Sequence, residues 1–331
     1  MSSLKLGALP RPGAVMIKWQ LPSGAEYFPL FPNAISSMPT SRTTFSSTIT
    51  KEFLTSFFEE VQVEGIPACI DMGGVDILPE HHLGTLCGLP IRDIIFINCT
   101  QGLIDQIHDD LPNCHPLAEI GIVIVIGDSI RLERIILLAK ELNISDIRSN
   151  YCQTVVKSCL EPFPEGETLP SSSVNSSKYF NAKKIFSNPP QLRMISYYLA
   201  ESLWNSDLRS ADLIFSCSHT GSLFASIVAQ LVQKPFYSML NLGPSLALKS
   251  RFGMDKLRNK NIVLIADMIC MGTELRVTES IVKILDGNLL GAIAITRYNS
   301  SEKYSVKSLV GRKQLENMQY HVTIPPLSAE Q

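Results

Sequence analysis

The chain has 331 residues, a formal net charge of −2 and a hydrophobic fraction of 45%. This length favours two domains over one, and this composition is typical of a globular chain that can bury a full core. There is no global basic excess for nucleic acid, residues 1–13 hold no apolar run long enough for a signal peptide, and the longest strong apolar run, Ile122–Ile126, is far too short for a membrane span. We therefore expect a cytoplasmic protein with no nucleic-acid partner and no membrane partner.

The eight cysteines are scattered along the chain without CxxC pairs. Cys69, Cys217 and Cys270 lie in or beside predicted core strands, which predicts buried, reduced thiols. Neither the cysteines nor the histidines show the spacing of zinc ligands, so we predict no metal site built from protein ligands.

In the first half of the chain, strand patterns alternate with helix patterns. The predicted elements, in order, are an extended hairpin-like segment at 14–33, a loop at 36–50, a helix at 51–61, a strand at 66–71, a helix at 81–87, a strand at 91–97, a polar irregular segment at 101–117, a strand at 122–126 and a helix at 132–142. This alternation predicts an α/β domain with a mostly parallel sheet flanked by helices.

The second half contains the most informative stretch. A helix is predicted over 192–204, and a strand over 213–217 precedes Ser218, His219, Thr220 and Gly221 and a further helix. The apolar run 262–266 then predicts a buried strand that ends at Asp267. A tight turn over 270–273 leads into a helix that Gly287 stops. A strand, a Gly-Thr turn and a helix start can hold a phosphate, because free N–H groups and the helix dipole point into the turn.

The two halves repeat this order, which favours a tandem duplication with domains 1–158 and 159–331. Three pairs of matching residues are nearly equally spaced, by 147, 145 and 139 residues: Gly74 and Gly221, Pro90 and Pro235, Asp128 and Asp267. The alternative is that any two α/β domains share such a rhythm.

Two motifs in the second half resemble those of a known family. Ala266–Thr273 resembles the phosphoribosyl-diphosphate (PRPP) motif of type I phosphoribosyltransferases and is closest to the orotate version. Tyr179-Phe180-Asn181-Ala182 resembles the orotate phosphoribosyltransferase N-terminus, which approaches the base. Ala266 departs from the pattern, because the family has a second acid there. Pro170 departs as well, since it replaces a lysine.

The resemblance implies a role for each candidate site residue in the second domain. Asp267 holds the ribose hydroxyls as the catalytic-site acid. The remaining candidates bind substrate: Cys270, Met271, Gly272 and Thr273 in the phosphate loop, Ser218, His219, Thr220 and Gly221 in the pyrophosphate loop, Tyr179 and Phe180 near the base, and Lys249 and Arg251 in the mobile loop. A solvated basic surface loop is the alternative for Lys249 and Arg251. Glu274 suits the helix dipole but would repel a phosphate.

The first domain departs further from the family. Its counterpart of the phosphate loop, Ser129–Glu133, has no glycine, and no Lys or Arg lies between Arg92 and Arg131. We therefore expect this domain to have a structural role.

The resemblance as a whole implies two tandem phosphoribosyltransferase-like domains, of which the second binds PRPP or a nucleotide, with Mg²⁺ accompanying PRPP. The implied activity is pentosyl transfer to a pyrimidine-like base, as in a pentosyltransferase. The alternatives are a catalytically inactive homologue that acts as a nucleotide sensor, regulator or scaffold, and a structural homodimer without a ligand. The tandem chain itself favours an internal pseudo-dimer or a homodimer.

Overall fold

The computed structural model describes residues 19–20, 26–29, 57, 68–73, 75, 93–97, 99–110, 121–126, 129–132, 147–163, 174–239, 257–299 and 303–323. The chain divides into two compact units, Met1–Arg148 and Ser149–Gln331. The domain boundary predicted after residue 158 falls inside helix α4 (Ile147–Cys159), most of which belongs to the second unit.

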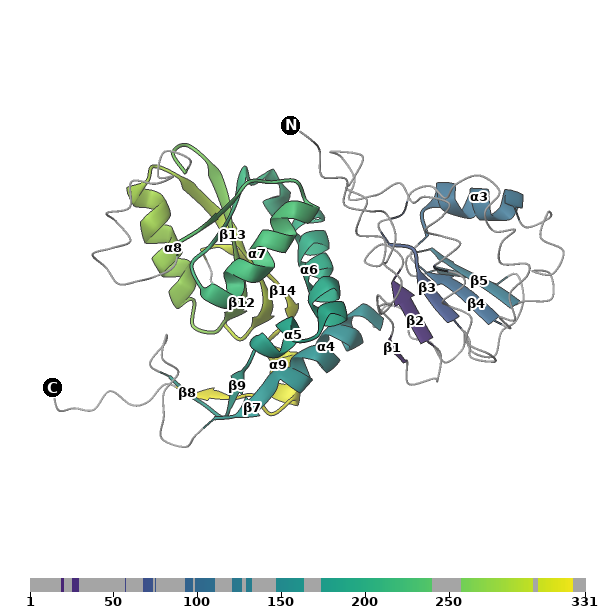
Figure 1. The fold of residues 1–331 in the computed structure, drawn as a ribbon, viewed down its shortest axis with the longest axis horizontal. Coiled ribbons are helices and arrows are strands. Elements are labelled where there is room, and N and C mark those ends of the chain that lie inside the picture. Colours follow the sequence, from purple (N-terminus) through teal and green to yellow (C-terminus); the bar gives the residue numbers. More distant parts are fainter. Residues whose placement is uncertain are drawn as a thin grey trace. The chain divides into compact units, whose positions relative to one another are not determined.

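Unit 1 is built on a six-stranded sheet whose strands follow the order of the sequence, β1-β2-β3-β4-β5-β6 (Figure 1). Its elements are β1 (Trp19–Gln20), β2 (Glu26–Pro29), β3 (Ala68–Asp71), β4 (Asp93–Ile97), α3 (Gln101–Asp110), β5 (Gly121–Ile126) and β6 (Ser129–Leu132). Strands β2 to β5 are parallel to one another, and β1 and β6 pair antiparallel at the two edges. The predicted mostly parallel sheet is therefore present in this unit.

Two predictions for unit 1 were wrong. Residues 101–110 form a helix instead of an irregular segment, because the Thr100 hydroxyl caps its start by accepting from Leu103 N–H at 3.3 Å, and Leu103 is buried. The segment that begins at Ser129 is a strand that pairs back on β5, so it is not a loop between a strand and a helix. The loop predicted at 36–50 and the helix predicted at 81–87 lie outside the described residues, and of the helix predicted at 51–61 only Phe57 is described. Of the helix predicted at 132–142 only Leu132 is described, and it belongs to strand β6.

A buried ion pair fixes the carboxyl end of β3. Asp71 is 2% exposed, and its carboxylate accepts from Arg148 Nε at 2.7 Å and Arg148 Nη2 at 2.8 Å. Gly73 N–H donates to the same carboxylate at 2.9 Å. Such a two-point guanidinium–carboxylate contact fixes geometry as well as charge, so it holds Arg148 against the end of β3 within unit 1.

Unit 2 is built on a five-stranded, fully parallel sheet with the order β11-β10-β12-β13-β14. The strands are β10 (Leu213–Ser216), β11 (Phe236–Ser238), β12 (Asn261–Ile269), β13 (Asn288–Arg297) and β14 (Ser305–Val310). The helices are α5 (Lys183–Phe186), α6 (Pro189–Trp204), α7 (His219–Leu231), α8 (Thr273–Ile284) and α9 (Arg312–Asn317), with a 3₁₀ turn at Asp207–Ser210.

Helices cover both faces of this sheet, as Figure 1 shows for α8 on one side and α6 and α7 on the other. The apolar residues of β12 are buried on both faces, which is why its sequence does not alternate. One core cluster joins α8 to the sheet, and its members include Phe215, Leu264, Leu275, Val282 and Leu289.

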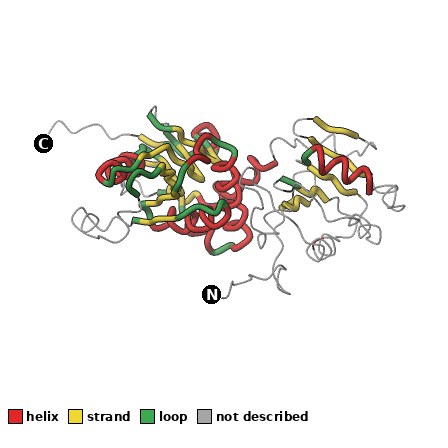
Figure 2. The backbone as a smooth tube through the Cα atoms, turned by 90° about the horizontal axis from the view of Figure 1, so that it is seen from above, coloured by secondary structure: helices red, strands yellow, loops and turns green. Residues whose placement is uncertain are grey.

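Short strands from both ends of unit 2 pair beside the sheet. β7 (Leu160–Pro162) pairs with β9 (Lys178–Phe180), and β8 (Asn175–Ser176) pairs with β15 (Val322–Thr323). Figure 2 shows the strands in yellow and the helices in red. The pairing of β8 with β15 brings Tyr179 and Phe180 close to Tyr320, although these residues are far apart in the sequence.

Three predicted element boundaries in unit 2 were also wrong. β12 continues past Asp267 to Ile269, because its pairing with β13 extends to Arg297. Helix α8 ends at Ile284, and Asp286 rather than Gly287 takes the left-handed conformation after it, at φ 53°. Helix α6 begins three residues before the predicted start at Leu192, because Asn188 caps it by accepting from Gln191 N–H at 3.2 Å.

The two sheets differ in strand order. In unit 1 the sheet follows the chain, whereas in unit 2 the strand order reverses at β10. Because the two strand orders differ, the fold does not confirm the tandem duplication, and both the duplication and the internal pseudo-dimer stay predictions.

Two general properties can be stated for the described parts of the chain. No helix there has the length and apolar character needed to cross a membrane. None of the six described cysteines forms a disulfide, and five of them are buried while Cys270 is half-buried.

Candidate functional site

The topology of unit 2 places a cavity at the carboxyl ends of its central strands. In open parallel sheets, ligands bind where the strand order reverses, outside the carboxyl ends of the two strands concerned. Here these strands are β10 and β12, and a cavity of about 290 Å³ lies beyond them. Its lining residues come from four segments of the chain: Tyr179, Phe180, Ser218, Thr220, Asp267, Met268, Ile269, Cys270, Met271, Gly272, Thr273, Glu274 and Tyr320.

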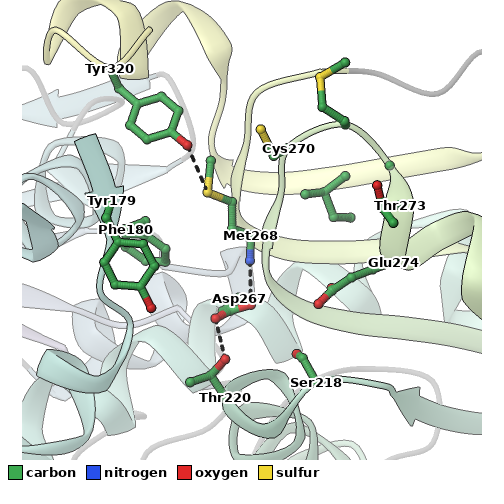
Figure 3. A pocket seen from close by; sticks show the side chains of 13 residues that line it. Tyr179, Phe180, Ser218, Thr220, Asp267, Met268, Cys270, Thr273, Glu274 and Tyr320 are labelled. Atoms are coloured by element: carbon green, nitrogen blue, oxygen red, sulfur yellow. Dashed lines mark hydrogen bonds between the residues drawn. The ribbon is translucent and has the colours of Figure 1, made fainter. Parts of the chain in front are cut away.

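Asp267 lines this cavity, and Figure 3 shows its carboxylate between Thr220 and Met268. One carboxylate oxygen accepts from the Thr220 hydroxyl at 2.5 Å, and the other accepts from Met268 N–H at 2.9 Å. Burial raises the pKa of the Asp267 carboxyl, and these hydrogen bonds act in the opposite direction. The carboxylate is thus held in one orientation with lone pairs remaining, which suits it to accept from a sugar hydroxyl.

The turn after β12 needs a glycine. Gly272 has φ 72° and ψ 16°, the left-handed conformation, and it is the residue from which α8 starts. Arg276 spans the turn from the next helical turn, with Nη1 donating to Met271 O at 3.1 Å and Nη2 donating to Thr273 Oγ1 at 3.3 Å. The sequence analysis did not single out Arg276, although its spacing of three from Thr273 places the two on one helix face.

At the start of α7, Gly221 has a different role from the anion-binding role that the sequence predicted. The Ser218 side chain caps α7 by accepting from Gly221 N–H at 3.1 Å, so this N–H group is already used. A Cβ at Gly221 would lie 2.6 Å from Ser218 Oγ and 3.1 Å from Ile265 O. The glycine is therefore required by close helix–strand packing, and His219, which is exposed, does not line the cavity.

Glu274 brings a second carboxyl group into the cavity from the first turn of α8. Its Oε2 atom is buried and has no hydrogen-bond partner among the described residues. Burial, and to a smaller extent the charge of Asp267, raises the pKa of Glu274 to about 8, although a hydrogen bond with the Ser218 side chain lowers it. At neutral pH this side chain is therefore mainly a neutral carboxylic acid.

Aromatic and sulfur-containing side chains form the other wall of the cavity (Figure 3). Tyr320 is fully buried, and its hydroxyl lies 3.6 Å from Met268 Sδ. Tyr179 is 39% exposed and stands at the rim. A wall of this kind suits a flat ring, because aromatic faces stack on one another and on heterocycles.

The structure brings nine of the predicted site residues to this one cavity: Asp267, Cys270, Met271, Gly272, Thr273, Ser218, Thr220, Tyr179 and Phe180. Lys249 and Arg251 lie outside the described residues. Met268 belongs to the Ala266–Thr273 motif, but the sequence analysis assigned it no role of its own in the site. Tyr320 was missed because it reaches the cavity through the β8–β15 pairing, which no local sequence pattern predicts.

The described residues do not form a metal site by themselves. No group of three or more His, Cys, Asp or Glu side chains among them is arranged to hold an ion. Both oxygens of Asp267 also accept hydrogen bonds. Mg²⁺ prefers oxygen ligands and in many sites is held by one or two carboxylates together with substrate phosphates.

Comparison with known proteins gives matches among solved structures only. No protein-family model and no curated protein matches the chain. A phosphoribosyltransferase from Corynebacterium diphtheriae matches with a TM-score of 0.40 and 10% identity over 51% of this chain and 98% of its own. Orotate phosphoribosyltransferase from Aeropyrum pernix matches with a TM-score of 0.39 and 13% identity over 52% and 98%. Leishmania donovani UMP synthase matches with a TM-score of 0.43 and 12% identity over 81% of each chain.

The matched structures belong to the family that the sequence motifs resemble. Their identities and TM-scores are low, so the description of the fold rests on the observed strand order. What that order shows is an α/β unit with a five-stranded parallel sheet, helices on both faces and a cavity at its switch point.

Proposed function

We propose that unit 2 binds a ribose phosphate, namely PRPP or a nucleotide, in the cavity around Asp267. The observation that carries the proposal is the position of Asp267 at the switch point, with the Gly272–Thr273 turn on one side and an aromatic wall on the other. In this arrangement Asp267 accepts from the ribose hydroxyls, the turn receives the phosphate and the wall stacks on the base.

We further propose that binding, rather than turnover, is the main activity. Pentosyl transfer from PRPP releases diphosphate, and the departing charge needs cationic groups close by. Among the described residues that line the cavity there is no Lys or Arg. Arg276 is near, but it donates to Met271 O and Thr273 Oγ1. This favours a nucleotide-sensing or regulatory homologue.

Transfer to a pyrimidine-like base is the second candidate. It depends on Lys249 and Arg251, and the aromatic wall formed by Tyr179, Phe180 and Tyr320 is the observation that favours it. If PRPP is the substrate, we expect Mg²⁺ to enter with its diphosphate.

The two candidates are separated by a turnover assay beside a binding assay. The full chain is incubated with PRPP, Mg²⁺ and orotate, uracil or adenine, and diphosphate release is followed, while thermal shift reports binding of PRPP, UMP and AMP. The proposal predicts a stabilising shift without diphosphate release. Release that a Lys249→Ala, Arg251→Ala double variant abolishes would establish transfer instead, and no shift with any of these ligands would contradict both candidates.

A further inference from the structure

Glu274 is the cavity residue that the proposed function does not yet explain. A phosphate-binding turn offers hydrogen-bond donors, whereas an ionised carboxylate only accepts. Yet Glu274 lines the cavity from the first turn of α8, directly after Gly272 and Thr273. Figure 3 shows its carboxyl group directed toward Asp267, and its Oε2 atom is buried.

The surroundings of Glu274 hold little positive charge. The titratable and charged groups on the neighbouring elements are Asp267 on β12, Cys217 between β10 and α7, His219 at the exposed start of α7, Cys270 in the turn, Arg276 on α8, Tyr179 on β9 and Tyr320 after α9. Burial raises the pKa of the Cys217 thiol to about 11 and raises that of Cys270 and of the two tyrosines, so these groups are neutral at physiological pH.

Asp267 and Glu274 are therefore two acids in one cavity without a dedicated cation among the described residues. Like charges in one site disfavour double ionisation, so one of the two acids retains a proton. Two donors hold the Asp267 carboxylate, whereas Glu274 has one, the Ser218 side chain, and its Oε2 atom has no partner among the described residues. The proton therefore belongs on Oε2 of Glu274, a hydrogen-bond donor for which the described residues supply no acceptor.

We propose that Glu274 binds the phosphate of the ligand as a neutral carboxylic acid, its O–H donating to a phosphate oxygen at the Gly272–Thr273 turn. This inference rests on the proposed function and adds a specificity-determining residue to it. No covalent bond is made or broken: the acid keeps its proton in the complex. Above the pH at which the free side chain ionises, binding a phosphate requires the uptake of one proton.

The test is the pH dependence of PRPP binding to the full chain, measured by calorimetry between about pH 6.5 and 9.5. A phosphate monoester is already mainly a dianion over this range, since its second pKa is about 6. For the wild-type chain we expect a constant affinity up to about pH 7.5, then a loss approaching tenfold per pH unit above about pH 8, with one proton taken up. The number of protons follows from repeating the titration in buffers of different ionisation enthalpy.

Variants make the result specific to Glu274. Glu274→Gln keeps a donor that cannot ionise, so its affinity should stay flat and exceed that of the wild type at least about fivefold at pH 9. Glu274→Ala has no donor and should lose about tenfold at pH 7. Asp207→Asn, which changes a charge on an exposed turn outside the cavity, should keep the wild-type profile.

Each outcome has a definite meaning. A Glu274→Gln profile that falls above pH 8 like the wild type, or binding without proton uptake at pH 9, overturns the inference while the proposed function stands. An absence of PRPP binding at every pH overturns both. Uridine, which has no phosphate, serves as the internal comparison, because any binding of uridine should not weaken above pH 8.

Discussion

Replacing Glu274 by Gln should stabilise unit 2 in a way that grows with pH, even without a ligand. In the folded chain burial and Asp267 raise the pKa of Glu274 from 4.5 to about 8. The folded chain therefore holds this proton more tightly than the unfolded chain does. The free energy of unfolding contributed by Glu274 falls as the pH rises from about 4.5 to about 8, and Gln has no such dependence.

The size of the effect follows from the same pKa values. At 1.36 kcal/mol per unit of pKa, a rise from 4.5 to about 8 sets an upper limit of about 5 kcal/mol on the difference between the two chains. Glu274 is half-buried, so water relieves part of this penalty, and we expect about 2 kcal/mol above pH 8. At about 2–4 °C per kcal/mol, this corresponds to roughly 4–8 °C in Tm.

The assay is scanning calorimetry of the full chain at five pH values between 5 and 9. Because the chain has two units, the transition of unit 2 is identified as the one that a core substitution, Leu264→Ala, lowers. The Tm difference between Glu274→Gln and the wild type should be near zero at pH 5 and reach its full size above pH 8. A difference that is the same at pH 5 and pH 9 would refute the reasoning, and Asp207→Asn should show no such growth.

Four further substitutions test the packing around the site and in unit 1. Gly221→Ala should lower the Tm of unit 2, because overpacking costs about 1–3 kcal/mol. The control is Gly102→Ala, whose Cβ meets nothing within 4 Å, and it should leave Tm unchanged or raise it. Equal losses of Tm in the two variants would contradict the packing argument. Gly272→Ala should lower the free energy of unfolding by about 1–2 kcal/mol, because the residue has a positive φ. It should also weaken PRPP binding measured by calorimetry, and unchanged binding would show that the turn plays no part. Arg148→Ala leaves the buried Asp71 carboxylate without its guanidinium and should destabilise unit 1 by about 3 kcal/mol. The loss is read from the thermal transition of unit 1, and a loss under about 1 kcal/mol would show that the ion pair does not stabilise the fold.

The sequence predicted the central part of the site because its signals are local. The unalternating run before Asp267 predicted a strand buried on both faces, and Gly272 with Thr273 predicted the turn and the helix start. Both are observed in β12 and α8. Tyr179 and Phe180, singled out from a short motif, lie in the same cavity.

The remaining features depend on contacts between distant parts of the chain. The order β11-β10-β12 is set by pairing between strands that a helix and a long segment separate, so no window of sequence contains it. Tyr320 reaches the cavity through the β8–β15 pairing for the same reason. Gly221 was assigned to an anion site, because its role in packing α7 against Ile265 depends on a helix–strand distance that sequence does not report.

The helix α3 was missed for a more local reason. Thr100 before an apolar residue at position 103 is a capping pattern, but the polar composition that follows it favoured an irregular segment. The burial of Leu103 shows that this helix packs an apolar side chain despite its polar composition.

The central claim is that the cavity around Asp267 binds a ribose phosphate, and calorimetric titration of PRPP with Mg²⁺ into the wild-type chain and Asp267→Asn tests it most directly. Asn keeps the shape of the side chain but removes its charge, and a hydrogen bond to a charged group contributes about 1.5–3 kcal/mol. The account predicts saturable binding to the wild type at neutral pH and a loss of roughly 10- to 150-fold in the variant, with both chains equally folded. Equal affinities in the two chains, or no heat from the wild type at millimolar PRPP, would contradict it.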